Sequence, residues 1–120
     1  MIRVALAAVT AYAVLFAHSA PARQMAPARL GVQASEYHLV LSRGSVKAGP
    51  ALIQLQNRGQ DPHDLRLERI GGKHTYAIAL TDPGKRRTIS LRLLPGRYRL
   101  WCSVLDHAQL GMQAVLRVVR

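Results

Sequence analysis

Three residues near the C-terminus carry side chains that bind soft metal ions, and they follow one another at short spacing. Cys102 is the only cysteine in the 120-residue chain, and His107 and Met112 follow it. Residues 98–102 alternate inward Tyr, Leu and Cys with Arg and Trp, the period-two pattern of a strand that has one face in a core. We therefore expect Cys102 at the end of a strand with its sulfur pointing inward. The loop that follows can bring His107 and Met112 back to it. A thiolate, an imidazole and a thioether favour copper over magnesium or calcium, and structural zinc sites usually carry more cysteines.

A trigonal copper centre needs a second histidine, with methionine as a long axial ligand. His63 is the candidate, because it follows a turn rich in Gly, Asp and Pro (residues 57–62) and precedes the alternating segment 65–67. His74 follows a Gly-Gly turn and would replace His63 if the strand register were different. His38 is expected on a solvated strand face.

Two motifs carry these residues: N-x-G-x-D-P-H-D-L from residue 57 and Y-x-L-W-C-x4-H-x4-M from residue 98. Together they resemble the cupredoxins, the small blue copper proteins of the plastocyanin and azurin type. The resemblance extends from about Val32 to Val118. It implies that His63, Cys102, His107 and Met112 are the ligands of one type 1 copper ion.

Asp64 departs from the family pattern, in which the residue after the first histidine is commonly Asn. A carboxylate here could accept a backbone N–H, such as that of Ser103, and so hold Cys102 in place. Its negative charge would then lower the reduction potential of the copper. A simple turn aspartate is an equal alternative, and Asn57 and Gly59 are expected to serve turn geometry alone.

The rest of the chain predicts an all-β fold, a Greek-key β-sandwich of about seven to eight strands, because short alternating segments recur with turn signals about every ten residues. One strand begins near Val32, and residues 76–80 are ambiguous between strand and loop. The clearest further segments are 37–41, 52–56, 65–67, 89–93, 98–102 and 114–118.

The N-terminus predicts export. A basic start, an apolar run at 4–17 and a small-residue site at 20–22 are typical of a secretory signal peptide. Residues 1–22 are accordingly expected to be the signal, 23–31 a flexible lead-in and 32–120 the copper-binding domain, located in the periplasm or another extracytoplasmic compartment. An uncleaved anchor is the alternative.

In an oxidising compartment a lone thiol favours a ligand role, although a buried inert cysteine is the alternative.

The charge balance is strongly basic, with 17 Lys and Arg against 6 Asp and Glu. The arginines are spread along strands, which does not favour nucleic acid as a partner. We expect either an acidic redox partner or an anionic membrane surface, or else simply a solvated face, on a monomeric protein.

The expected function is one-electron transport between redox partners. Copper delivery without redox turnover is the alternative. An enzyme is not expected, because the related copper enzymes need a second copper centre and no hydrolytic triad stands out.

Apolar residues around His107 predict a docking patch for the partner, or else Leu105 and Leu110 pack into the core. The patch would contain Val104, Leu105, Ala108 and Leu110.

Overall fold

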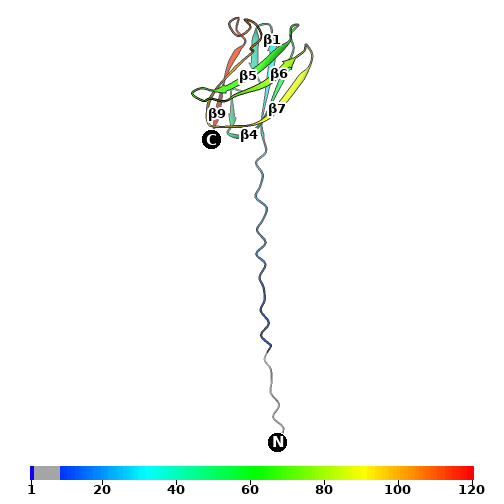
Figure 1. Cartoon of the computed structure of the whole chain (residues 1–120), viewed down its shortest axis with the longest axis vertical. Coiled ribbons are helices and arrows are strands. Elements are labelled where there is room, and N and C mark those ends of the chain that lie inside the picture. The colour runs from blue at the N-terminus through cyan, green and yellow to red at the C-terminus, as the bar shows by residue number, and fades with distance from the viewer. Residues whose placement is uncertain (2–8) are drawn as a thin grey trace.

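The computed structural model describes Met1 and residues 9–120. Residues 9–27 have no helix or strand and extend away from the folded part (Figure 1). Residues 2–8, which include the start of the predicted signal peptide, lie outside the described residues. Within the part of the chain that is described, no helix is long and apolar enough to span a membrane.

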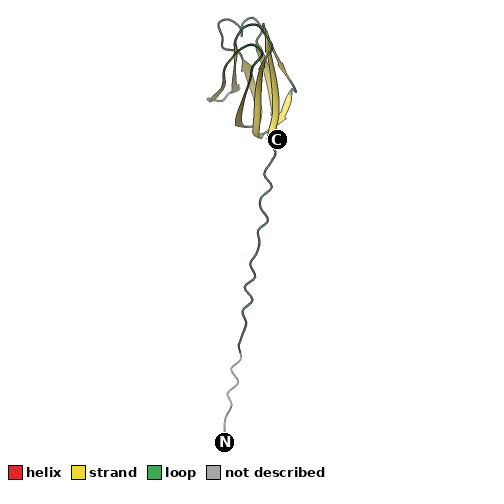
Figure 2. Ribbon diagram, turned by 90° about the vertical axis from the view of Figure 1, so that its right-hand side faces the viewer, coloured by secondary structure: helices red, strands yellow, loops and turns green. Residues whose placement is uncertain are grey.

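Nine strands make up the described fold, and they form two layers (Figure 2). The strands are β1 (Ala28–Ser35), β2 (His38–Leu41), β3 (Ser45–Lys47), β4 (Gly49–Asn57), β5 (His63–Arg69), β6 (Thr75–Thr81), β7 (Arg86–Leu93), β8 (Gly96–Trp101) and β9 (Gln113–Val119). One sheet has the order β2-β1-β4-β7 and the other the order β3-β9-β8-β5-β6. The chain crosses repeatedly between the two sheets, as expected of a Greek-key sandwich. The predicted fold class is confirmed.

Alternating apolar positions on both sheets form a single core. Val32, Ile53, Leu65 and Leu100, each on a different strand, are fully buried. The residues next to each of them along its strand are less buried. Each such side chain contributes about 1.5–3 kcal/mol through burial. The sandwich is therefore held mainly by aliphatic side chains.

The structure differs from the sequence-based expectation in three details. Residues 38–47 form two short strands in different sheets, and residues 75–81, which were ambiguous, form β6. Strand β1 begins at Ala28, inside the segment expected to be a flexible lead-in. Its start pairs in parallel with β4, with Ala28 opposite Ala51, and buries Leu30. This long-range pairing leaves no signal in the local sequence.

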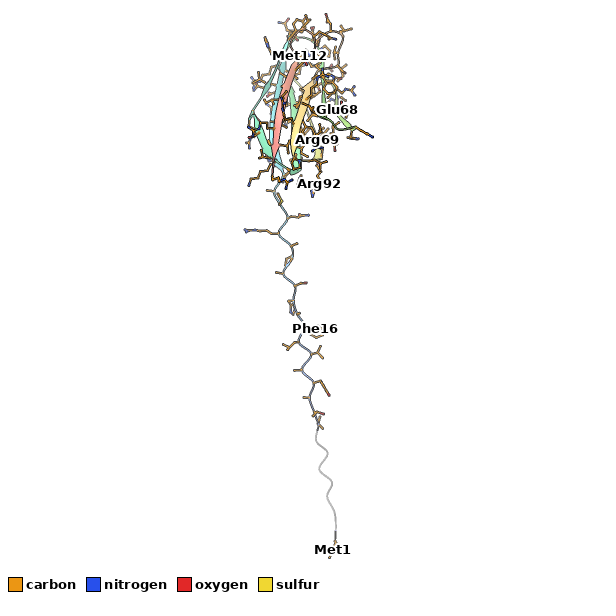
Figure 3. All side chains as sticks on the ribbon, turned by 90° about the vertical axis from the view of Figure 1, so that its left-hand side faces the viewer. Met1, Phe16, Glu68, Arg69, Arg92 and Met112 are labelled. Carbon is orange, nitrogen blue, oxygen red and sulfur yellow. The ribbon has the colours of Figure 1, made fainter. Side chains whose placement is uncertain are left out.

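The segments that carry the candidate ligands meet at one end of the sandwich. Met112 lies at the end away from the N-terminal segment (Figure 3). Cys102 directly follows β8, His63 begins β5, and the loop 102–112 closes over the same end before β9 starts. The fold thus brings the start of β5 next to the end of β8 and its following loop, although His63 and Cys102 are 39 residues apart in the sequence.

Candidate metal centre

His63, Cys102 and His107 form a compact buried cluster. One ligand atom from each lies within 4.8 Å of the others. Cys102 Sγ is 3.9 Å from His63 Nδ1 and 3.7 Å from His107 Nδ1. His74 is exposed and packs its ring against Tyr76 instead. The structure therefore brings His63, and not His74, next to the cysteine.

Backbone hydrogen bonds shape the loop that carries the other two candidates. Cys102 N donates to Met112 O at 3.1 Å, and Met112 N donates to His107 O at 3.0 Å. His107 N in turn donates to Val104 O at 3.0 Å. Met112 is fully buried. The loop thus returns Met112 to the level of Cys102.

The spacing of the donor atoms suits a small ion bound in a trigonal plane. With bonds of about 2.3 Å to sulfur and about 2.05 Å to nitrogen, a 120° angle separates the two donors by about 3.8 Å. The two observed sulfur–nitrogen distances, 3.9 and 3.7 Å, lie on either side of that value. Two imidazoles, one thiolate and a nearby thioether are the donor set of a blue copper centre.

Burial controls the state of the cysteine. Loss of solvation raises the pKa of the Cys102 thiol, and the negative charge of Asp64 adds to the rise. Without metal, the thiol therefore keeps its proton at neutral pH. Binding of a metal ion would then release that proton, because the thiolate is the form that coordinates.

Asp64 ties the strand that begins with His63 to the residue after Cys102. Its carboxylate accepts the Ser103 backbone N–H at 2.6 Å and also the Ser103 hydroxyl. Arg66 Nε donates to the same carboxylate at 3.3 Å. The expected contact between Asp64 and Ser103 N–H is confirmed, and the alternative of a simple turn aspartate is wrong.

The turn before His63 is fixed by Asn57. Its side-chain oxygen accepts the Gly59 N–H, and its amide donates to the carbonyls of Asp61 and Thr81. Asn57 therefore does set the turn geometry, but the expectation that it serves the turn alone is wrong, because its amide also links that turn to β6.

Glu36 belongs to the site although sequence reasoning missed it. Its carboxylate lies 3.0 Å from His63 Nε2 and also accepts the N–H groups of Gln60 and Asp61. The neighbouring Tyr37 ring packs edge-on against His107, with ring centroids 5.2 Å apart. No motif or period marks the Glu36–Tyr37 turn; the only signal was a lone acidic residue beside a tyrosine at a strand end.

Two apolar side chains of the loop that carries His107 are exposed. Leu105 is 88% exposed and Leu110 is 50% exposed, whereas His107 is only 4% exposed. Val104 instead packs against the core. The alternative that Leu105 and Leu110 pack into the top of the core is therefore wrong, and both side chains face solvent.

Comparison with solved structures agrees with this architecture. Auracyanin from Roseiflexus castenholzii, in its dithionite-reduced form, matches with a TM-score of 0.64 at 16% identity, over 80% of this chain and 100% of that chain. Auracyanin A, a blue copper protein of Chloroflexus aurantiacus, matches with a TM-score of 0.62 at 16% identity, over 78% and 99%.

The fold also occurs within a larger copper protein. The copper-containing nitrite reductase of Thermus scotoductus matches with a TM-score of 0.55 at 18% identity, over 85% of this chain and 25% of that chain. No family model and no curated protein matches this sequence. The structural likeness establishes a cupredoxin fold, with the cluster of His63, Cys102 and His107 at one end of it.

Proposed function

We propose that this protein is an exported type 1 copper protein that carries one electron at a time between redox partners. His63, Cys102, His107 and Met112 would hold the copper ion, because two imidazoles, a thiolate and a thioether form a donor set that suits copper. The observation that carries this proposal is the buried Sγ–Nδ1 spacing of 3.9 and 3.7 Å, which suits a trigonal ion.

Copper supplies the chemistry by alternating between Cu(I) and Cu(II). The protein's part is to keep the donor atoms in nearly one arrangement, so that little reorganisation accompanies each transfer. Backbone hydrogen bonds link Cys102, His107 and Met112 and so fix the loop. A hydrogen bond from Ser103 N–H to Asp64 fixes the residue next to Cys102. The site is thus preorganised by contacts that do not involve the metal.

Burial of the ligands favours a carrier over a delivery protein. His63 and Cys102 are fully buried and His107 is 4% exposed, so a bound ion could not easily be passed on by ligand exchange. An electron, in contrast, could pass through the edge of His107. Among the described residues one group of three metal-binding side chains is found.

The surroundings of the site support a transient partner. The exposed Leu105 and Leu110 offer apolar contact surface on the loop that carries His107. The formal net charge of +11, which becomes +10 when Arg3 is removed with the signal, would speed the approach of an acidic protein. The N-terminal signal directs the chain outside the cytoplasm, where we propose that the mature protein acts as a monomer.

The test combines redox cycling with two histidine variants. The copper-loaded protein should accept and release one electron per copper over repeated cycles without losing the ion. Loss of the ion on reduction would indicate delivery instead. His63→Ala should weaken copper binding, and added imidazole should restore it by filling the open position. His74→Ala is the control and should bind copper as the unmodified protein does; the reverse result would contradict the ligand assignment.

A further inference from the structure

Glu36 makes an unusually complete set of contacts for a carboxylate at the surface of the sandwich. Oε1 accepts the Gln60 N–H at 2.8 Å and the Asp61 N–H at 2.7 Å. It also lies 3.0 Å from His63 Nε2. The side chain is 26% exposed, whereas His63 is fully buried. The carboxylate is thus the polar partner of the outer nitrogen of a buried imidazole.

This contact decides which nitrogen of His63 carries the proton. An ionised carboxylate can only accept a hydrogen bond, so His63 Nε2 must be the donor. In a neutral imidazole the other nitrogen, Nδ1, then presents its lone pair. Nδ1 is the atom that lies 3.9 Å from Cys102 Sγ. Glu36 therefore selects the tautomer in which His63 can bind a metal beside the cysteine.

The carboxylate is held in its charged form. Oε1 accepts two backbone N–H groups, those of Gln60 and Asp61, and hydrogen bonds of this kind stabilise the ionised form of a carboxylate. A full negative charge therefore lies one imidazole ring away from the metal position at neutral pH. Negative charge there favours Cu(II) over Cu(I).

The fold holds this residue in place from several sides. Parallel pairing of β1 with β4 sets Ala34 opposite Asn57, which brings Glu36 to the turn before His63. A Cβ on Gly59 would lie 2.8 Å from the Glu36 carboxyl carbon, so a side chain there would displace the carboxylate from this position. The adjacent Tyr37 packs on the ring of His107. One turn thus contacts both histidines of the cluster.

We propose that Glu36 is a positioning residue of the metal centre, which fixes His63 as the tautomer with a proton on Nε2 and biases the bound copper toward its oxidised state. Only the bias toward oxidised copper rests on the proposed function. The tautomer of His63 is a property of the metal-free protein, so the tautomer assignment and the proposed function can fail separately.

The first measurement is nitrogen-15 NMR of the histidine rings in the metal-free protein. His63 should show a protonated Nε2 and an unprotonated Nδ1. A proton on Nδ1 would overturn the proposal whether or not the protein binds copper, and it requires no variant that could unfold.

The second measurement compares Glu36→Gln with Glu68→Gln. Gln can still accept the His63 N–H, so the fold and tautomer should persist while the charge is lost. Glu68 lies on the same strand as His63, about 16 Å further along by strand rise, and serves as the matched charge control. Glu36→Gln should lower the affinity for Cu(II) by roughly 10-fold to 100-fold, lower the affinity for Cu(I) less, and so raise the reduction potential. Glu68→Gln should leave both affinities nearly unchanged. Equal effects in the two variants, or a lower potential in Glu36→Gln, would overturn the proposal.

Discussion

Replacement of Asp64 by Asn tests whether the carboxylate beside the cysteine sets the reduction potential of the copper. Asn keeps the shape of Asp and one acceptor oxygen, so the Ser103 backbone N–H, now 2.6 Å from the carboxylate, can stay bonded. The change therefore removes a charge and leaves most of the geometry. Asp64 is only 5% exposed, so its charge is poorly screened by solvent.

The magnitude follows from Coulomb's law. Two unit charges about 7 Å apart, in a medium with an effective dielectric constant of about 20, interact by about 2.4 kcal/mol. For a single electron this corresponds to about 100 mV. Arg66 lies 3.3 Å from the carboxylate and offsets part of its field. We expect the reduction potential of Asp64→Asn to rise by about 50 to 100 mV.

The assay is voltammetry of the copper-loaded proteins, with the visible spectrum as a check on the site. Arg66→Gln is the matched opposite: it removes the positive partner of the same carboxylate and should lower the potential. The shift should be smaller, because the Arg66 side chain is 40% exposed. A potential that falls or stays constant in Asp64→Asn, with an unchanged spectrum, would refute the electrostatic role of Asp64.

Three other predictions follow from the surface, the N-terminus and the buried thiol. Leu110→Glu should slow electron transfer to an acidic partner and leave the copper spectrum unchanged, because the side chain is half exposed and lies outside the core; an altered spectrum would mean that Leu110 supports the site. Mass spectrometry of the exported protein should find a chain starting near Arg23, whereas a full-length product in the membrane fraction would show an uncleaved anchor. Burial raises the pKa of Cys102, so copper uptake at pH 7.5 should release about one proton. For the same reason copper affinity should rise with pH. Uptake without proton release would show that the thiol is already ionised.

The strand that carries Cys102 could be predicted because its signal is local. Tyr98, Leu100 and Cys102 are buried, whereas Arg99 is exposed and Trp101 is only half-buried, as the alternation requires. The contact of Asp64 with Ser103 could also be anticipated. Asp64 directly follows His63 and Ser103 directly follows Cys102, and both preceding residues were expected to be ligands. Such inferences need only the period of a strand and the position of its end.

Glu36 could not be predicted, because its contact is made by the fold rather than by a motif. It lies 27 residues before His63 in sequence. The parallel pairing of β1 and β4 brings it there, and parallel partners leave no turn signal between them. The early start of β1 at Ala28 was missed for the same reason.

The visible spectrum of the copper-loaded, oxidised protein tests the central claim most directly. A thiolate bound to Cu(II) in a trigonal site gives an intense blue charge-transfer band, so the unmodified protein should be blue. Cys102→Ser should be colourless at the same copper loading, because a hydroxyl donates far less charge to copper than a thiolate does. A colourless unmodified protein, or a blue Cys102→Ser variant, would contradict the assignment of this cluster as a type 1 copper centre.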